Sequence, residues 1–246
     1  MANNDYRSNV FDLSRNLRRL KDLSSTLDSD HIANVDEVLT KLENHRFTVA
    51  VVGEFKRGKS TFINALLGRE IIPSDVLPTS ATLNRVTFGD KRVLIFYKKK
   101  ADQEEHIEEI EVDQMKQFIT KLTPESAKIA STIREAVIYY PAPYCKNYNT
   151  DIIDTPGLGD DALMTDVTMR VIPHVDATLM VIKATIPFSN TESQFLWRLL
   201  DEGLPTPIFI INAIDLVRAR ERDRLVTNIT TRIKKSMTEY AENKYP

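Results

Sequence analysis

The sequence predicts a three-layer α/β domain with a mostly parallel central sheet, preceded by amphipathic helices near the N-terminus. Three observations support this prediction. Short β-branched runs recur from Phe47 onward, and they are continuous rather than alternating, as expected for strands buried on both faces of a sheet. Segments with helical periodicity lie between these runs. A glycine-containing turn at residues 53–60 joins the first strand to the helix that follows it.

Composition places the chain among ordinary globular proteins. Of its 246 residues, 42% are hydrophobic and 28% are charged, which provides enough apolar surface for a core and excludes a wholly disordered chain. The net charge is −2 and there is no basic tail, so nothing indicates a nucleic-acid partner. A single cysteine, Cys145, and the lack of a long apolar stretch favour a cytoplasmic location. Any membrane contact is expected to be peripheral and made by regions outside this chain.

Residues 1–46 are predicted to form N-terminal helices. Apolar residues recur at steps of three and four between Val10 and Leu20, and again between Val35 and Leu42. Such helices need a surface to pack on. They either cover the side of the domain that follows or belong to a helical bundle completed elsewhere.

From Phe47 onward the pattern alternates between strands and helices. The predicted strands 84–88 and 92–98 are separated by Gly89-Asp90, which predicts a hairpin between them. An acidic stretch from Asp102 to Asp113 leads into a predicted helix at 114–122. The other predicted strands are 47–52, 133–140, 150–154, 177–182 and 207–211, and the other predicted helices are 59–67, 165–172, 191–200 and 217–240.

The turn after the first strand carries a phosphate-binding motif. Residues 53–60, Gly-Glu-Phe-Lys-Arg-Gly-Lys-Ser, fit G-x-x-x-x-G-K-[ST] between an apolar strand and a helix. The glycines let backbone N–H groups point at phosphate oxygens, and the helix N-terminus adds positive charge. Lys59 is expected to reach the β- and γ-phosphates, and the Ser60 hydroxyl to bind Mg²⁺. The sequence therefore predicts a nucleotide site with Mg²⁺ as its cofactor.

A second motif, Asp154-Thr-Pro-Gly157, ends the strand at 150–154. An acidic residue at the carboxyl end of a strand beside a phosphate loop can hold Mg²⁺, often through water. Gly157 can donate its backbone N–H to the γ-phosphate. Alone, D-T-P-G is a common turn sequence, and it indicates a nucleotide site here because a phosphate loop precedes it.

A third motif, Asn212-Ala-Ile-Asp215, follows the strand at 207–211. The Asp215 carboxylate can accept hydrogen bonds from N1–H and the exocyclic amine of guanine, a donor pair that adenine does not offer. The alternative is an ordinary helix N-cap. The position of the motif after a buried strand favours base binding, so GTP and GDP are the expected ligands.

Together these motifs resemble the GTPase domain of the dynamin superfamily, most closely the bacterial dynamin-like proteins and more distantly the mitofusins. The resemblance covers about residues 47–216 and rests on the run from Val51 to Gly68, on D-T-P-G-L-G and on N-x-x-D. The long spacing between Ser60 and Asp154 also fits, because dynamin-like domains carry insertions there. The resemblance implies a P-loop GTPase domain over 47–246 that stops before the family's last base-contacting loop.

The resemblance also assigns roles to individual residues. Mg²⁺ would be held by Ser60, by Asp154 and by a hydroxyl of the first switch that also orients the attacking water. Either Thr79 or Ser80 could supply that hydroxyl, and a serine would depart from the family's usual threonine. The implied nucleotide-binding residues are Glu54, Phe55, Lys56, Arg57, Gly58, Lys59, Ser60, Thr61, Gly157, Asn212 and Asp215.

Two further departures affect the implied chemistry. The family's guanine motif usually has a lysine where this chain has Ala213, so base affinity would be weaker and selectivity would rest on Asp215. The family lacks the catalytic glutamine of Ras-like proteins, and this chain has Leu158 after D-T-P-G. Related proteins use a polar or basic side chain in the phosphate loop, often ordered by dimerisation, and Lys56 holds that position. Lys56 is expected to assist catalysis together with Lys59; the alternative is that Lys56 is solvated or pairs with Glu54.

The expected function is Mg²⁺-dependent hydrolysis of GTP. By resemblance, the full-length protein would couple hydrolysis to membrane remodelling and to dimerisation, or to a hetero-partner, across the nucleotide face. Two alternatives stay open. One is a guanine-nucleotide-binding assembly module that does not hydrolyse GTP. The other is an ATPase of the wider P-loop class, because Ala213 weakens the guanine signature.

Overall fold

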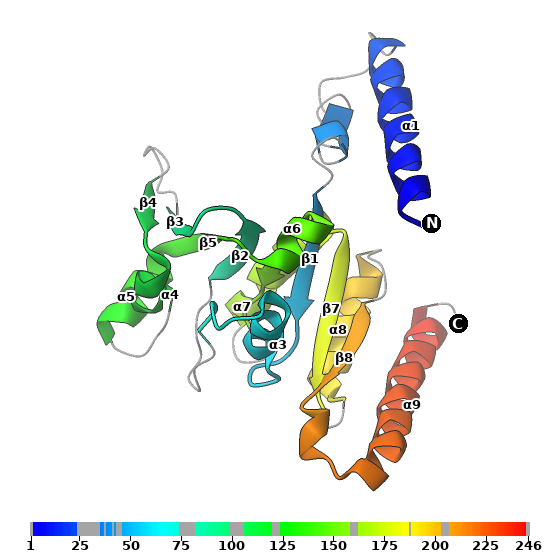
Figure 1. The fold of residues 1–246 in the computed structure, drawn as a ribbon. Helices are drawn as coiled ribbons and strands as arrows, with labels where there is room; N and C mark the ends of the chain where they lie inside the picture. The colour runs from blue at the N-terminus through cyan, green and yellow to red at the C-terminus, as the bar shows by residue number, and fades with distance from the viewer. Residues whose placement is uncertain are drawn as a thin grey trace. The chain divides into compact units, whose positions relative to one another are not determined.

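The computed structural model describes residues 2–23, 35–36, 38–40, 42, 46–73, 82–98, 106–119, 124–157, 162–186, 188–202 and 207–244. The chain divides into two compact units, Met1–Phe47 and Thr48–Pro246. The first unit contains helix α1, Ala2–Leu23, and residues 35–36, 38–40 and 42 are also helical (Figure 1). Within this unit Lys21 Nζ donates to Asp36 Oδ1 at 2.5 Å. Whether these helices cover the following domain or join a helical bundle completed elsewhere stays a prediction.

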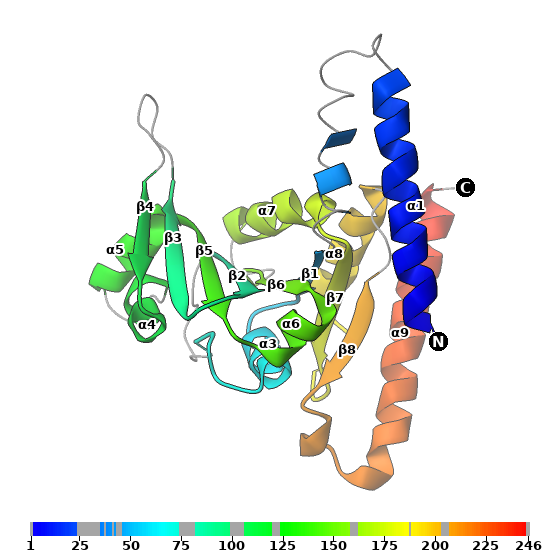
Figure 2. The same ribbon diagram turned by 45° about the horizontal axis from the view of Figure 1, so that its top comes forward.

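In the described part of the chain, the second unit is built on an eight-stranded sheet in the order β4-β3-β5-β2-β6-β1-β7-β8 (Figures 1 and 2). Strand β7 pairs in parallel with β1 and β8, and β2 pairs in parallel with β5. The pairs β2–β6, β3–β4 and β3–β5 are antiparallel. The strands are β1 Phe47–Val52, β2 Leu83–Phe88, β3 Arg92–Tyr97, β4 Ile107–Ile110, β5 Ile133–Tyr140, β6 Thr150–Asp154, β7 Ala177–Lys183 and β8 Ile208–Asn212.

In the part of this unit that the structure describes, helices flank the sheet and enclose two apolar cores, which confirms the predicted α/β class. The α-helices are α3 Lys59–Leu67, α4 Met115–Ile119, α5 Pro124–Thr132, α6 Pro143–Tyr148, α7 Ala162–Val171, α8 Asn190–Asp201 and α9 Ala219–Lys244, and the 3₁₀ turns are η1 Val112–Gln114, η2 Ile172–His174 and η3 Ile214–Leu216. Within the described residues, none of the helices has an apolar stretch long enough to cross a membrane.

Strand β1 shows why a continuous apolar run was the right signal for a central strand. Successive side chains of a strand point to opposite faces of the sheet. Val51 packs in one core with Ile63 of α3, whereas Ala50 and Val52 pack in the other core with Leu196 of α8. All of these side chains are buried. Because both faces of β1 are covered, no polar alternation appears in its sequence.

The predicted hairpin at Gly89-Asp90 is wrong, because β5 lies between β2 and β3. The register places Val86, Ile138 and Val93 in one row across the three strands, and all three are 0% exposed. Each of β2 and β3 therefore pairs with β5 instead of with the other, and Ile138 of β5 lies between Val86 and Val93. The turn instead passes the end of β5, where the Gly89 N–H donates to Tyr140 O at 3.3 Å. The Gly-Asp pair correctly indicates that the chain turns after β2, but it does not show which strand lies next to β2 in the sheet.

Among the described strands and α-helices, three short ones were not expected from the sequence: β4, α5 and α6. Strand β4 lies inside the acidic stretch, antiparallel to β3, and the Tyr97 hydroxyl donates to Glu108 at 2.6 Å. Helices α5 and α6 fill parts of the chain that had no predicted element, and Pro143 stands at the start of α6, where its missing N–H is tolerated. The predicted helix at 114–122 is observed only as η1 and α4, and residues 120–123 lie outside the described residues.

Candidate nucleotide-binding site

The three sequence motifs meet at one edge of the sheet, called here the nucleotide edge. Parallel strands bring their carboxyl ends to the same edge, so the loops after β1, β7 and β8 lie together. The segment after β6 joins them, because Thr155 donates to Val51 O from both its N–H (3.3 Å) and its hydroxyl (2.8 Å). Ala184 N donates to Asn212 O at 2.8 Å, which ties the loop after β7 to the end of β8.

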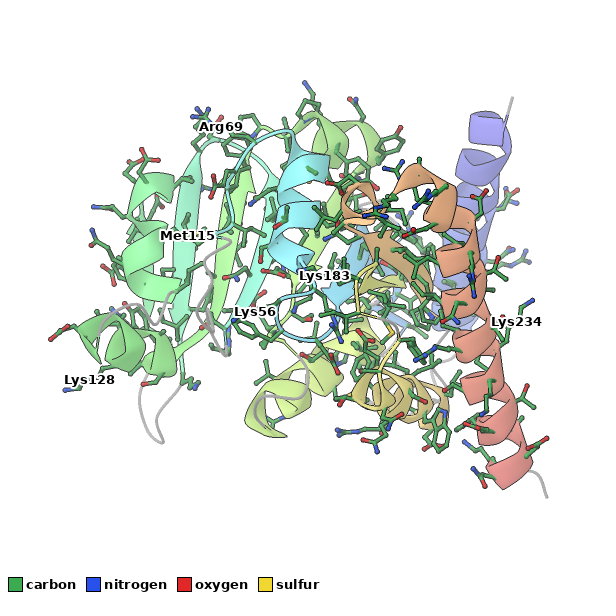
Figure 3. All side chains as sticks on the ribbon, turned by 90° about the horizontal axis from the view of Figure 1, so that it is seen from below. Lys56, Arg69, Met115, Lys128, Lys183 and Lys234 are labelled. Carbon is green, nitrogen blue, oxygen red and sulfur yellow. The ribbon has the colours of Figure 1, made fainter. Side chains whose placement is uncertain are left out.

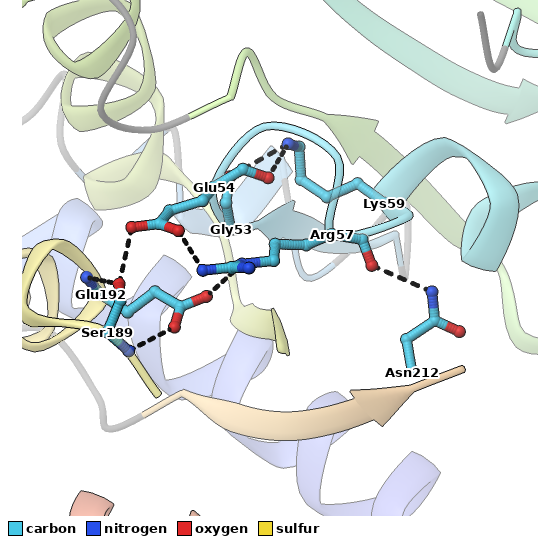
Figure 4. Close-up of polar contacts among 7 residues, drawn as sticks. All are labelled: Gly53, Glu54, Arg57, Lys59, Ser189, Glu192 and Asn212. Atoms are coloured by element: carbon cyan, nitrogen blue, oxygen red, sulfur yellow. Dashed lines mark hydrogen bonds and ion pairs between the residues drawn. The ribbon is translucent and has the colours of Figure 1, made fainter. Parts of the chain in front are cut away.

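The phosphate loop curls around the side chain of Lys59. The Lys59 ammonium donates to Gly53 O at 3.0 Å and to Glu54 O at 3.2 Å, and the residue is 8% exposed (Figure 4). These contacts hold the cation against the inner carbonyls of the loop. A phosphate group bound by the loop would therefore meet a positive charge that is already in place.

Gly58 lets the base motif approach the phosphate loop. Its φ of 90° is in the left-handed region, and a Cβ added there would lie 2.2 Å from Asn212 Nδ2. That amide nitrogen donates to the carbonyls of Arg57 at 3.0 Å and Gly58 at 3.4 Å. Asn212 thus joins the end of β8 to the backbone of the loop at residues 53–60.

Gly157 makes a second close approach. A Cβ at this position would lie 3.0 Å from Phe55 Cα and 3.1 Å from Phe55 N. Any larger residue would push the D-T-P-G segment away from the phosphate loop. The backbone of Gly157 is therefore beside the loop, where its N–H can face a bound phosphate. Leu158 lies outside the described residues.

Asp154 and Ser60 form a corner of oxygen atoms beside Lys59. The Ser60 hydroxyl donates to Asp154 Oδ2 at 3.1 Å, and Asp154 is 6% exposed. Among the described residues, Asp154 Oδ1 has no hydrogen-bond partner. Burial raises the pKa of Asp154 to about 6, against the opposing effects of Lys59, Ser60 and Asn84.

This corner fits Mg²⁺. The ion prefers hard oxygen ligands and is usually bound by one or two protein groups together with phosphates and water. A hydroxyl, a buried carboxylate and its unpartnered oxygen supply such a set. The described residues contain no group of three or more His, Cys, Asp or Glu side chains that could hold a metal by themselves. Asn84 pairs with Asp154 across β2 and β6, and its buried side-chain oxygen also has no donor among the described residues. No sequence pattern pointed to Asn84.

Lys56 and Arg57 are neighbours in the loop with opposite surroundings. Lys56 is exposed, has a left-handed φ of 61°, and holds its ammonium 5.2 Å from the centre of the Phe55 ring. Figure 3 shows it at the phosphate-loop end of α3, with Arg69 at the other end. Arg57 is 4% exposed. Its guanidinium binds Glu54, and its Nε donates to Glu192 Oε1 at 2.9 Å, so Glu54 pairs with Arg57 rather than with Lys56.

Four residues form a closed ring of hydrogen bonds and ion pairs that we call the Arg57 ring: Glu54, Arg57, Ser189 and Glu192 (Figure 4). The Ser189 hydroxyl donates to Glu54 Oε1 at 2.6 Å, and the Ser189 N–H donates to Glu192 Oε2 at 2.8 Å. Glu192 and Ser189 also form the capping box at the start of α8. Sequence reasoning missed Glu192 and Ser189 as partners of the loop. The pattern Ser-x-x-Glu indicates a helix start but not what its carboxylate binds.

The base motif ends in an exposed turn. Asp215 lies in η3 and is exposed, and Ala213 before it has a left-handed φ of 57°. Thr61 lies exposed in the first turn of α3. The two first-switch candidates, Thr79 and Ser80, lie outside the described residues. The structure therefore brings the phosphate loop, Asp154, Gly157 and Asn212 together.

Comparisons with known proteins find a matching family profile and similar sequences. The profile of the Dynamin family matches residues 49–214. The chain is 31% identical over 93% of its length to a protein described as "Uncharacterized protein in xynA 3'region" from Caldicellulosiruptor sp.. It is 31% identical over 72% of its length to the bacterial dynamin-like protein of Nostoc punctiforme, and 27% identical over 78% to dynamin-like protein A of Bacillus subtilis.

The fold is also shared with a solved structure of an oligomerised bacterial dynamin pair, described as a mechanism for long-range sensing and tethering of membranes. The TM-score is 0.66 over 96% of this chain, at 19% sequence identity. This chain spans 56%, 26% and 21% of the three sequence relatives and 37% of that structure. The shared part is thus a portion of longer proteins.

Proposed function

The chain belongs to the dynamin family of GTPases, and from that premise we propose that it binds GTP with Mg²⁺ at the nucleotide edge and hydrolyses it to GDP and phosphate. The observation that carries the proposal is the joining of the three motifs. Thr155 is bonded to β1, Asn212 is bonded to the phosphate loop, and Ser60 is bonded to Asp154. A chance match to a short motif would not bring the other two motifs into contact with it.

The residues of the chain have separate tasks in this proposal. The loop amides and Lys59 bind the phosphates and offset their charge. Asp215, exposed beyond β8, reads the guanine edge, while Asn212 holds the loop. Lys56 is the proposed catalytic cation, because it is exposed at the loop while Arg57 is buried between two carboxylates. Its positive charge would offset negative charge that develops on the transferring phosphoryl group.

Ser60 and Asp154 are the proposed protein groups that hold Mg²⁺, with a first-switch hydroxyl from Thr79 or Ser80. When bound, Mg²⁺ supplies charge neutralisation for the phosphate oxygens. The unpartnered Oδ1 of Asp154 supports this role, since a buried carboxylate oxygen without a donor is costly unless a ligand completes it.

Calorimetric titration of GDP, a GTP analogue and an ATP analogue into this chain with Mg²⁺ tests the proposal. Binding of the guanine nucleotides alone is expected. Equal binding of the ATP analogue would favour an ATPase and would contradict the role of Asp215. Phosphate release measured on the same protein separates a GTPase from a non-hydrolysing guanine-nucleotide module, which would bind GTP without releasing phosphate.

We further propose that the whole protein associates through its nucleotide face with a second copy or a related partner, and reaches membranes peripherally through regions outside this chain. The fold shared with an oligomerised dynamin pair supports this proposal. Light scattering of the full-length protein with GDP and with a GTP analogue provides the test. An increase in mass with the analogue is expected, and a mass independent of nucleotide would contradict the association.

A further inference from the structure

The Arg57 ring needs no outside ligand. Each of its four carboxylate oxygens has a donor: Glu54 accepts from Ser189 and Arg57, and Glu192 accepts from Arg57 and from the Ser189 N–H. Arg57 is 4% exposed and Glu192 is 0% exposed. The carboxylate oxygens of the ring therefore all have donors within the fold.

The ring joins two loops that are far apart in sequence. Arg57 and Glu192 are separated by 135 positions, and they meet because β1 and β7 are parallel neighbours whose following loops share one edge. On the α8 side, the ring is anchored by a helix whose Phe195, Leu196 and Leu199 are buried in the core. The phosphate loop is thus attached to a rigid element.

The contacts of the Arg57 ring fix the phosphate loop on both sides of Lys56. Glu54 and Arg57 are fixed on either side of the Phe55–Lys56 pair, and Lys56 itself has a left-handed backbone. A non-glycine residue in that conformation is disfavoured and persists only where neighbouring contacts impose it. The ring supplies such contacts from both sides and leaves the Lys56 side chain exposed.

Burying two carboxylates and one guanidinium between the phosphate loop and α8 has a large desolvation cost. A buried ion pair is often no more stabilising than apolar residues of the same volume, because the charges lose their hydration. Its geometry, however, is directional: Arg57 reaches one carboxylate with Nε and the other with Nη2. The arrangement therefore fixes orientation more than it adds stability.

Resting on the proposed GTPase function, we propose that Arg57 and Glu192 are positioning residues that clamp the phosphate loop to the first turn of α8 and hold Lys56 in its outward, left-handed conformation. Glu192 has two tasks in this clamp. One oxygen accepts from Arg57 and the other completes the helix cap at Ser189. A glutamine has only one acceptor oxygen, so Glu192→Gln loses one of these bonds while it keeps the shape.

The test compares Glu192→Gln with Glu135→Gln by hydrogen–deuterium exchange in the nucleotide-free protein. Glu135 is a matched control, because it accepts from Arg85 Nε at the same 2.9 Å but joins β5 to β2 away from the nucleotide edge. Glu192→Gln is expected to speed exchange of amides 54–59 about tenfold, equivalent to about 1.4 kcal/mol. Glu135→Gln is expected to leave those amides unchanged. Equal acceleration by both variants would overturn the clamp.

A second measurement uses dissociation of fluorescent GDP and a double-mutant cycle. Glu192→Gln is expected to raise the dissociation rate several-fold, and to add less than twofold in an Arg57→Gln background, because the partner is already gone. Additive effects would overturn the clamp. If the wild type binds no GDP, the proposed function fails, while the exchange comparison still decides the clamp. If Arg57→Gln does not fold, the comparison of Glu192→Gln with Glu135→Gln decides it alone.

Discussion

Glu192 and Asp154 are both buried carboxylates at the nucleotide edge, but the fold completes only one of them. Glu192 has a donor for each oxygen, from Arg57 and from Ser189. Asp154 has a donor for Oδ2 from Ser60, while Oδ1 has none among the described residues. Burial raises the pKa of both groups. The difference separates a carboxylate that positions the loop from one that is available to a ligand.

Removing the Arg57 guanidinium from the Arg57 ring should have the largest effect, a loss of unfolding free energy. Arg57→Gln leaves the carboxylates of Glu54 and Glu192 buried and facing each other, so we expect the free energy of unfolding to fall by about 3–5 kcal/mol in urea denaturation. Arg85→Gln is the control, because its pair with Glu135 is partly exposed and should cost about 1 kcal/mol or less. Similar losses for the two variants would contradict a special role for the buried ring.

Neutralising Asp154, whose Oδ1 has no donor among the described residues, should lower GTP turnover without lowering stability. Asp154→Asn is expected to lower GTP turnover about 100-fold, equivalent to about 2.7 kcal/mol, with no loss of unfolding free energy in the nucleotide-free protein. Asp151→Asn is the control on the same strand, since Asp151 is buried toward the start of β6. A loss of stability in Asp154→Asn without a loss of turnover would remove the distinction between the two carboxylates.

Truncating the exposed cation of the loop should have a smaller effect. Lys56→Ala is expected to lower turnover about tenfold, about 1.4 kcal/mol, with little change in GDP affinity. Lys91→Ala is a matched control, because Lys91 is also an exposed lysine over an aromatic ring, that of Tyr140. Steady-state phosphate release and calorimetry on each variant provide the comparison. Unchanged turnover in Lys56→Ala would rule out the catalytic role.

Restoring the family's lysine in the base motif should have a modest effect. Ala213→Lys is expected to raise GDP affinity about threefold, because an aliphatic stem can pack on the base. Ala213 has a left-handed φ, so Ala213→Gly is the control that relieves the backbone without adding a side chain. Calorimetry of both variants separates packing from strain. An equal gain in Ala213→Gly would assign the effect to the backbone.

The smallest expected effect is a pH dependence of the completed site. Burial raises the pKa of Glu192, although Ser189 and Arg57 oppose it. The folded state therefore binds this proton more tightly than the unfolded state, and Glu192 contributes less stability as pH rises through its pKa. We expect the stability advantage of the wild type over Glu192→Gln to shrink from pH 4 to pH 7 in urea denaturation. A growing advantage would mean that pairing with Arg57 outweighs burial.

Local sequence patterns predicted most of the strands and helices. The order of the strands in the sheet depends on long-range contacts, and the patterns did not predict it. The bounds of β1, α3, β5 and β6 follow from periodicity and flanking turns, and the structure reproduces them. The position of β5 between β2 and β3 did not follow, because the row of Val86, Ile138 and Val93 joins residues up to 52 positions apart. Strand β4 was hidden by its acidic residues, whose pattern resembles a solvated segment.

The residues of the site also fall into those predictable from local motifs and those that depend on long-range contacts. The phosphate loop, Asp154 and Asn212 were predictable because each motif has a fixed place relative to a strand or helix. The pairing of Arg57 with Glu192 was not predictable, because a buried glutamate 135 positions away shows no sign of its contact in the sequence. The role of Glu192 depends on which strands are neighbours, and that is a property of the whole sheet.

The insertion of β5 between β2 and β3 also has a consequence for how the protein is made. On a ribosome, β2 and β3 emerge before the strand that separates them. About fifty residues follow β2 before β5 is complete, which takes about 3–10 s at typical elongation rates. During that interval two apolar strands have their natural neighbour missing, and pairing with each other would be a trap. Early binding by a chaperone, or slow translation near residue 140, would therefore affect the yield of folded protein.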